Sequence, residues 1–244
     1  SPVDYKPGAL IPLKVRQLTS NHDLAYAYYD LPFCRPSGGI KDASENLGEY
    51  LQGTTLQNSD YQLAMLENTT CNVLCRRVYT DDEVSELVEK IDKVYHLHWI
   101  VDNLPGAYGK PGRANYADGF PLGGVIQKAD GTPDPESHFL LNHHHITIQY
   151  HATPSGNRVV GFYVQPVSVY HTYTDKWSDD DESRPILTSC PKDTGLDTTT
   201  NPMLITGPDS TKQVAVIWSY DVFWVPSTTS WAFRWDVYLN MGGA

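Results

Sequence analysis

Apolar residues recur along this chain with two periods, and each period predicts a different kind of element. Between residues 81 and 95 they recur at helical spacing and share one face of an α-helix. The residues of this face are Val84, Leu87, Val88, Ile91, Val94 and Tyr95. Thr80 and Glu83 have the spacing of a capping box, and Asp81 and Asp82 suit the positive end of the helix dipole. We therefore predict a helix over about residues 81–95.

Elsewhere the apolar period is two, which is typical of strands. One face of the segment 214–224 carries Val214, Val216, Trp218, Tyr220, Val222 and Trp224. We expect residues 231–239 to return beside this segment as the second strand of a hairpin. A second hairpin should pair about 139–152 with 158–171 across the Pro- and Gly-containing turn between them. Shorter strands are expected at 10–18, 61–66, 72–79 and 96–101.

These elements predict a mainly β fold, sandwich-like and antiparallel, with one docked α-helix at about 81–95. Seventeen prolines and eighteen glycines punctuate many short segments, as in β-sandwiches. Two stretches, 108–120 and 175–212, read as surface loops, and the second is long enough to be functional or mobile. No linker divides the chain, so we expect residues 1–244 to form a single domain.

Composition narrows the class of protein. A 40% hydrophobic and 11% aromatic content is ample for a core. The net charge of -11 and the lack of a basic cluster argue against nucleic acid or anionic lipid as partners. No stretch has the 18 or so apolar residues of a membrane span, and the first residues do not resemble a signal peptide, so the chain as given is expected to be soluble.

Four cysteines, an even number, fit an oxidising compartment. If residues 71–75 are extended, the Cα atoms of Cys71 and Cys75 lie about 13 Å apart, at ~3.3 Å per residue. That separation exceeds the roughly 7 Å limit for a disulfide. We therefore expect Cys34 and Cys190 each to pair with one of the other two, without specifying which.

His143, His144 and His145 form the most tempting cluster for a metal. On a strand, His143 and His145 share a face at a spacing that suits one zinc ion. His151 shares that face but would lie about 20 Å from His145, too far to be the third ligand. Exposed polar positions on a half-solvated strand are the simpler interpretation, and we predict no structural metal.

Catalytic motifs are lacking. Asp102, Asp236 and Glu49 could supply the two carboxylates of a glycosidase, but buried hydrogen-bond acceptors are the more frequent role, with Arg234 as the charge partner of Asp102 or Asp236. The acidic run at 179–182 lacks the spacing of a calcium loop. We predict a protein that is not an enzyme and needs no cofactor.

Several motifs, taken in order, resemble the N-terminal lumenal domain of the nonaspanins, the transmembrane 9 superfamily, over about residues 13–239. They are Leu-Pro-Phe-Cys-Arg-Pro at 31–36, Ser-Glu-Asn-Leu-Gly-Glu at 44–49, Cys71 with Cys75, Trp-Ile-Val-Asp-Asn-Leu-Pro at 99–105, Asn142-His143, and Trp-Ala-Phe-Arg-Trp-Asp-Val-Tyr-Leu at 231–239. Their family-like positions include Trp99, Asp102, Asn103, Pro105, Arg234, Trp235 and Asp236.

The resemblance implies a mature ectodomain that follows a signal peptide and precedes nine membrane helices. It implies a membrane protein of Golgi and endosomes, with this domain lumenal, that sorts other membrane proteins and also reaches the cell surface. The implied partners are its own membrane domain, cargo membrane proteins and a second copy of itself. In that setting Asn68, in the sequon Asn-Thr-Thr, should carry a glycan. The alternative is a secreted carbohydrate-binding module or glycosidase.

Four of the six tryptophans lie between residues 214 and 239. If they all belong to the core, Trp235→Ala should cost ~3–5 kcal/mol of folding free energy.

Overall fold

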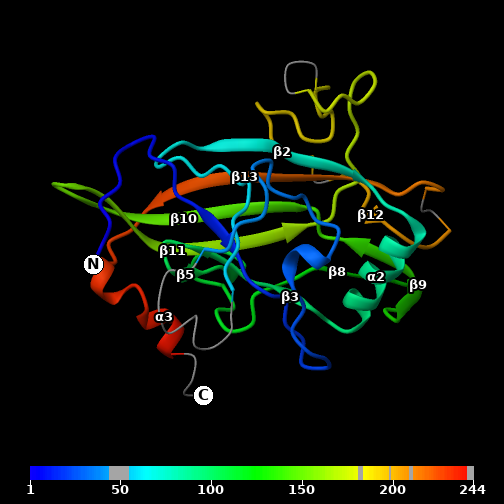
Figure 1. Cartoon of the computed structure of the whole chain (residues 1–244), viewed down its shortest axis with the longest axis horizontal. Helices are drawn as coiled ribbons and strands as arrows, with labels where there is room; N and C mark the ends of the chain where they lie inside the picture. The colour runs from blue at the N-terminus through cyan, green and yellow to red at the C-terminus, as the bar shows by residue number, and fades with distance from the viewer. Residues whose placement is uncertain (44–54, 181–183, 198, 209–210, 241–244) are drawn as a thin grey trace.

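The computed structural model describes residues 1–43, 55–180, 184–197, 199–208 and 211–240 (Figure 1). The strands are β1 (Leu13–Val15), β2 (Thr69–Val78), β3 (His96–Leu97), β4 (Trp99–Val101), β5 (Leu104–Pro105), β6 (Ala107–Tyr108), β7 (Phe120–Pro121), β8 (Gly123–Gln127), β9 (Pro133–Leu140), β10 (His143–Thr153), β11 (Gly156–Val167), β12 (Met203–Leu204) and β13 (Ala215–Pro226). The helices are α2 (Asp81–Asp92) and α3 (Asp236–Leu239), with 3-10 turns η1 (Tyr28–Asp30) and η2 (Trp231–Phe233).

A five-stranded sheet in the order β2-β13-β10-β11-β6 runs along the long axis of the molecule (Figure 1). β10 and β11 form the predicted hairpin, and β2 runs antiparallel to β13. β10 and β13, however, pair in parallel, as do β11 and β6. The sheet is therefore mixed, with two antiparallel and two parallel strand pairs.

The period of two along β13 decides which side of this sheet faces the core. The predicted apolar face, from Val214 to Trp224, belongs to the main hydrophobic cluster. The opposite face of the same strand carries Ile217, Ser219 and Asp221, which are also buried. Both sides of β13 are thus covered, but only one of them is apolar throughout.

Three smaller sheets also contribute residues to the main core. Their strand orders are β1-β4-β5, β12-β9-β8 and β3-β7. Trp99 of β4, Phe120 of β7 and Leu140 of β9 are fully buried and join the same core as β13. The predicted mainly β class with a docked helix is confirmed. The expected strand at 10–18 shortens to β1, and 61–66 forms no strand but a single bridge between Ala64 and Leu10.

Helix α2 begins where its capping box predicts. The Thr80 side chain accepts a hydrogen bond from the Glu83 backbone, and the Glu83 carboxylate accepts one from the Thr80 backbone. The helix ends at Asp92 and not at 95, because Val94 adopts a left-handed φ of 54° that reverses the chain. That reversal still returns Tyr95 to the core.

The predicted C-terminal hairpin is wrong. β13 already has β2 along one edge and β10 along the other, so no edge remains for residues 231–239. These residues instead form η2 and α3, which lie in Figure 1 near the N-terminus, at the opposite end from α2. Trp235 is 40% exposed and not a core residue, which removes the reason for the large cost expected of its truncation.

Candidate functional site

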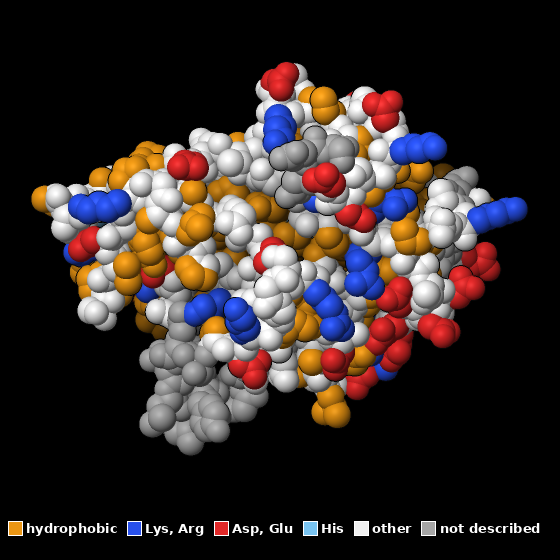
Figure 2. Space-filling view, turned by 45° about the horizontal axis from the view of Figure 1, so that its top comes forward, with side chains coloured by type: hydrophobic (Ala, Val, Ile, Leu, Met, Phe, Trp, Pro, Cys, Tyr) orange, Lys and Arg blue, Asp and Glu red, His pale blue; other side chains and the backbone are white. Residues whose placement is uncertain are grey.

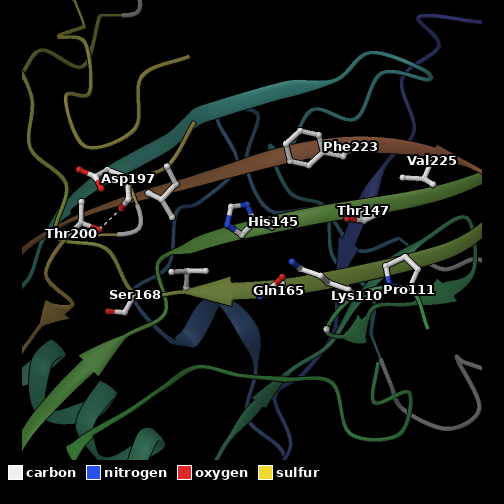
Figure 3. Close-up of a pocket in the computed structure, with 13 residues that line it drawn as sticks. Lys110, Pro111, His145, Thr147, Gln165, Ser168, Asp197, Thr200, Phe223 and Val225 are labelled. Carbon is white, nitrogen blue, oxygen red and sulfur yellow. Dashed lines mark hydrogen bonds between the residues drawn. The ribbon is translucent and has the colours of Figure 1, made fainter. Parts of the chain in front are cut away.

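A groove of about 530 Å³ lies over the side of the five-stranded sheet that faces away from the main core. Outward side chains of three neighbouring strands line its floor, including Phe223 of β13, His145 and Thr147 of β10, and Gln165 of β11 (Figure 3). Its walls come from residues 109–111 and from Leu196, Asp197 and Thr200. The two predicted surface loops therefore both border the same groove.

A cluster of buried polar groups lies beside the groove floor, on the same face of the sheet. The Oδ2 atom of Asp221 is 2.5 Å from Nδ1 of His145 and 3.1 Å from Nε2 of His143, and its Oδ1 accepts a hydrogen bond of 2.6 Å from the Cys71 backbone. His143 is completely buried, whereas the His145 side chain is 28% exposed and lines the groove. His145 thus links the groove to the interior.

The cluster continues inward as a chain of hydrogen bonds. Ser219 Oγ lies 2.7 Å from Nδ1 of His143 and 2.6 Å from Nε2 of His171, and Nδ1 of His171 lies 2.8 Å from Ser189 Oγ. A carboxylate only accepts, so His143 and His145 each donate a ring N–H to Asp221. It follows that Ser219 donates to His143, His171 donates to Ser219, and Ser189 donates to His171. Both nitrogens of the His143 and His171 rings are thus paired in the neutral form.

The pKa values agree with that arrangement. Burial lowers the pKa of His143, and it lowers the pKa of His171 to about 3. Burial alone would raise the pKa of Asp221, but hydrogen bonds from His143, His145 and the Cys71 backbone hold it below its usual 3.8. An ionised Asp221 carboxylate, accepting hydrogen bonds while His143 and His171 stay neutral, is therefore the stable state of the buried part of the cluster near neutral pH.

The exposed-strand interpretation of the histidines is wrong, since His143 and His144 are 0% and 1% exposed. β13 also supplies the third metal-type donor that β10 lacks: atoms of His143, His145 and Asp221 all lie within 4.8 Å of one another. Two ligands of a tetrahedral zinc ion lie about 3.3 Å apart. The 2.5 Å between His145 and Asp221 is too short for that and suits a hydrogen bond. The absence of a structural metal stays a prediction.

Sequence reasoning missed Asp221, Ser219 and His171. A signal was present: Ser219 and Asp221 are polar residues at alternate positions of an otherwise apolar strand, on the face opposite the predicted core. His171 has no such periodic context.

Two disulfides join the cysteines as expected, and they settle the open choice. Cys34 pairs with Cys75 and Cys71 with Cys190, with Cα separations of 5.8 and 5.6 Å. Cys71 and Cys190 belong to a small second hydrophobic cluster with Ile217. Because Cys71 also donates to Asp221, this disulfide joins the chain at Cys190 to the polar cluster beside the groove.

The sequence motif at 99–105 is a tight hairpin. Asp102 and Asn103 have positive φ angles of 48° and 64° and join β4 to β5 as a two-residue turn, a conformation that Asp and Asn tolerate. Trp99 is completely buried, and Pro105 pairs with Ile100. The motif therefore encodes a turn with a core anchor.

Asp102 is the acceptor that ties this turn to the C-terminal segment. Its carboxylate lies 2.7 Å from Nη1 of Arg234, a buried ion pair, and accepts a hydrogen bond of 2.8 Å from the Tyr5 hydroxyl. The Arg234 guanidinium also donates to the Val159 carbonyl and lies over the Trp231 ring. The expected Arg234 partnership is thus with Asp102.

The other acidic candidates do not join Asp102. Asp236 is exposed on α3, and Glu49, with the motif at 44–49, lies outside the described residues. Of the acidic run at 179–182, the last two positions also lie outside them, and Asp179 accepts a hydrogen bond from the Trp177 ring. Among the described residues, the structure gives no support to a two-carboxylate glycosidase site.

Asn68 is exposed just before β2. Its side-chain oxygen accepts a hydrogen bond of 2.8 Å from the Trp224 backbone N–H. This bond does not use the side-chain amide nitrogen, to which a glycan would be attached. The position is compatible with glycosylation.

Comparison with known proteins identifies the family. The model of the Endomembrane protein 70 family matches residues 25–243. Transmembrane 9 superfamily member 9 of Arabidopsis thaliana is 35% identical over 99% of this chain and 38% of its own length. Transmembrane 9 superfamily member 4 of Homo sapiens is 32% identical over 99% of this chain and 38% of its own length.

A third relative, 33% identical over 98% of this chain and 37% of its own length, is named putative phagocytic receptor 1a of Dictyostelium discoideum. The chain spans less than two fifths of the length of these relatives. No solved structure matches it. No helix among the described residues is both long and apolar enough to cross a bilayer. By sequence, the chain belongs to the Endomembrane protein 70 family, whose relatives here include the transmembrane 9 superfamily members.

Proposed function

We propose that this chain is the lumenal, non-enzymatic domain of a nine-span protein of Golgi and endosomal membranes that sorts other membrane proteins. The observation that carries the proposal is the groove over the five-stranded sheet. The membrane setting comes from the family to which the chain belongs, Endomembrane protein 70. In this proposal the groove binds a lumenal segment of a cargo membrane protein, and the domain sits on its own membrane part.

The groove is built for binding. Its lining mixes apolar side chains such as Phe223 and Val225 with polar ones such as Gln165 and Thr147, a combination typical of recognition sites. Two loops border it, and one of them is fixed to β2 by the Cys71–Cys190 disulfide. A fixed wall limits the entropy lost when a partner is bound.

The chemistry of the cluster supports a non-enzymatic role. Ser219, His143 and Asp221 are hydrogen-bonded in the order of a nucleophilic triad, but Ser219 is 1% exposed and its hydroxyl is held between two imidazoles. A nucleophile must reach its substrate. This serine lies on the sheet face opposite the main core and is covered there, so the array acts as a buried polar support beside the groove floor.

Charge favours protein partners over nucleic acid. The net charge is -11, and on the face shown in Figure 2 the acidic side chains gather toward the end that carries α2, while the basic ones are scattered. Such a surface offers no continuous basic footprint to phosphates on the side shown. We propose cargo proteins, the membrane part of the same protein and a second copy of the chain as its partners.

The groove is tested in the full-length protein in cells. Thr147→Arg places a long charged side chain on the groove floor, and Thr228→Arg, at an exposed position outside the groove lining, is the matched control. We expect Thr147→Arg alone to reduce both proximity labelling of cargo from the lumenal side and its delivery to the surface. Equal labelling and delivery in both variants would contradict the groove proposal, and hydrolysis of a glycan panel by the purified chain would contradict the non-enzymatic one.

A further inference from the structure

The C-terminal segment carries an unusual set of exposed apolar side chains. Phe233, Trp235, Val237 and Leu239 are 63%, 40%, 42% and 72% exposed. They fall within seven residues of mostly helical chain and span only ~9 Å along its axis at about 1.5 Å of rise per residue. Because residues two apart in a helix point about 200° apart, they are spread on both flanks of the side that lies opposite the anchored Arg234 and Tyr238. A surface this rich in large apolar groups is a mark of an interaction site.

The segment is held firmly while these side chains remain uncovered. Arg234 is buried in its ion pair with Asp102, and the Tyr238 hydroxyl donates a hydrogen bond of 2.6 Å to the Pro105 carbonyl. Both anchors fasten the segment to the β4–β5 hairpin and its turn. Positions 235 and 237 lie between the two anchored residues and positions 233 and 239 lie directly outside them, so all four exposed apolar side chains are presented from a fixed base.

We infer that these four side chains insert into the headgroup region of a zwitterionic lipid bilayer. Trp and Phe beside aliphatic residues are the composition that membrane interfaces favour. The segment offers no exposed basic residue, since Arg234 is buried, and Asp236 is exposed, so anionic headgroups are the wrong match. The relatives are named as transmembrane proteins and are more than twice as long as this chain, so a bilayer is available.

This inference rests on the proposed placement of the chain beside a membrane, but it does not depend on the groove. Contact at this segment would set the domain's orientation, because the Asp102–Arg234 pair joins the segment rigidly to the core. The inserted side chains would anchor one end of the domain to the bilayer surface.

The test is flotation of the purified chain with phosphatidylcholine vesicles. We expect the chain to float with them, less with phosphatidylserine vesicles, and Phe233→Ser/Leu239→Ser to lower the partition coefficient at least about tenfold, because burying one such side chain already contributes about that factor. Leu24→Ser/Ile186→Ser, which removes apolar groups that are 83% and 70% exposed elsewhere, is the matched control and should float like the parent.

Depth is measured with brominated lipid. It should quench part of the tryptophan fluorescence, and Trp235→Phe should abolish that part while the chain still floats. No flotation of the parent, or equal flotation of both double variants, would overturn the inference. A third result would also overturn it: residues 233–239 are protected from hydrogen exchange in the full-length protein, while the purified chain does not bind vesicles. That result would assign the surface to contact with the membrane domain. Thr147→Arg should float like the parent, because the groove takes no part in lipid binding. A negative flotation result therefore contradicts the lipid inference and not the groove proposal.

Discussion

His144→Leu should make the fold less sensitive to acid. His144 lies on the core face of β10, with its ring centroid 4.7 Å from that of Trp99, 5.6 Å from Phe120 and 6.3 Å from Trp218. It is 1% exposed, and its Nδ1 atom has no hydrogen-bond partner among the described residues. Burial lowers the pKa of this imidazole from 6.5 to about 3.

The sign and size of the effect follow from proton linkage. Between pH 6.5 and about 3 the unfolded chain binds a proton at His144 and the folded chain does not, so folding stability rises with pH through this window. At pH 5 protonation of the unfolded state costs the fold about 2 kcal/mol through this residue, and at pH 7 only about 0.2 kcal/mol. Leucine fits the apolar surroundings and cannot titrate. The variant should equal or exceed the parent at pH 7, because a buried unpaired polar atom is removed.

Urea unfolding of both proteins at pH 7 and pH 5, with disulfides intact, measures the effect. We expect the stability difference between variant and parent to grow by about 2 kcal/mol toward pH 5. Burial also lowers the pKa of His171 and His98, but these residues are common to both proteins and cancel in the difference. His22→Leu, at an exposed position, should show no such growth. A pH dependence of His144→Leu that matches the parent would refute the reasoning.

Four further outcomes are expected. Cys34→Ser/Cys75→Ser should lower the free energy of unfolding by about 4 kcal/mol, because it opens a loop of 41 residues; unchanged urea midpoints would contradict this. Asp102→Asn should cost about 3–5 kcal/mol by leaving the Arg234 charge buried without its partner, and Asp102→Asn/Arg234→Leu should recover part of that loss in the same assay; a double variant as unstable as the sum of its parts would count against it. Asn68 should carry a glycan in material from a eukaryotic secretory pathway, as glycopeptide mass spectrometry can check. Untagged, chelator-washed protein should hold no stoichiometric zinc in elemental analysis, given the short imidazole–carboxylate distance.

The sequence predicted well what depends on neighbours along the chain. The capping box at Thr80, the apolar period of 214–224 and the hairpin of β10 with β11 are all local patterns, and all appear in the structure. The pairing of Cys34 and Cys190 with the two central cysteines rested on the reach of four extended residues, which is also local. Such features are set by backbone geometry before the tertiary fold forms.

What failed depended on partners distant in the chain. The segment 231–239 has strand-like composition, but β2, from more than a hundred residues earlier, takes the edge of β13 that it needed. Composition cannot show which edge is vacant. The segment then becomes helical and keeps only Arg234 fully buried. The β4–β5 turn fixes the position of the Asp102 carboxylate. Arg234 pairs with that buried carboxylate, so an arginine and not a tryptophan anchors the C-terminal segment.

The histidines of β10 are a second case in which the sequence could not reveal partners distant in the chain. Alternation along β10 separates His144 from His143 and His145, but it does not reveal that a loop closed by Cys190 covers the second face. Once that face is covered, polar side chains on it must find partners or destabilise the fold. Ser219 and Asp221 of β13 supply those partners through pairing in parallel register with β10. Polar residues on both strands of one buried face are therefore a sequence signature of a cover, and here that cover also forms a wall of the groove.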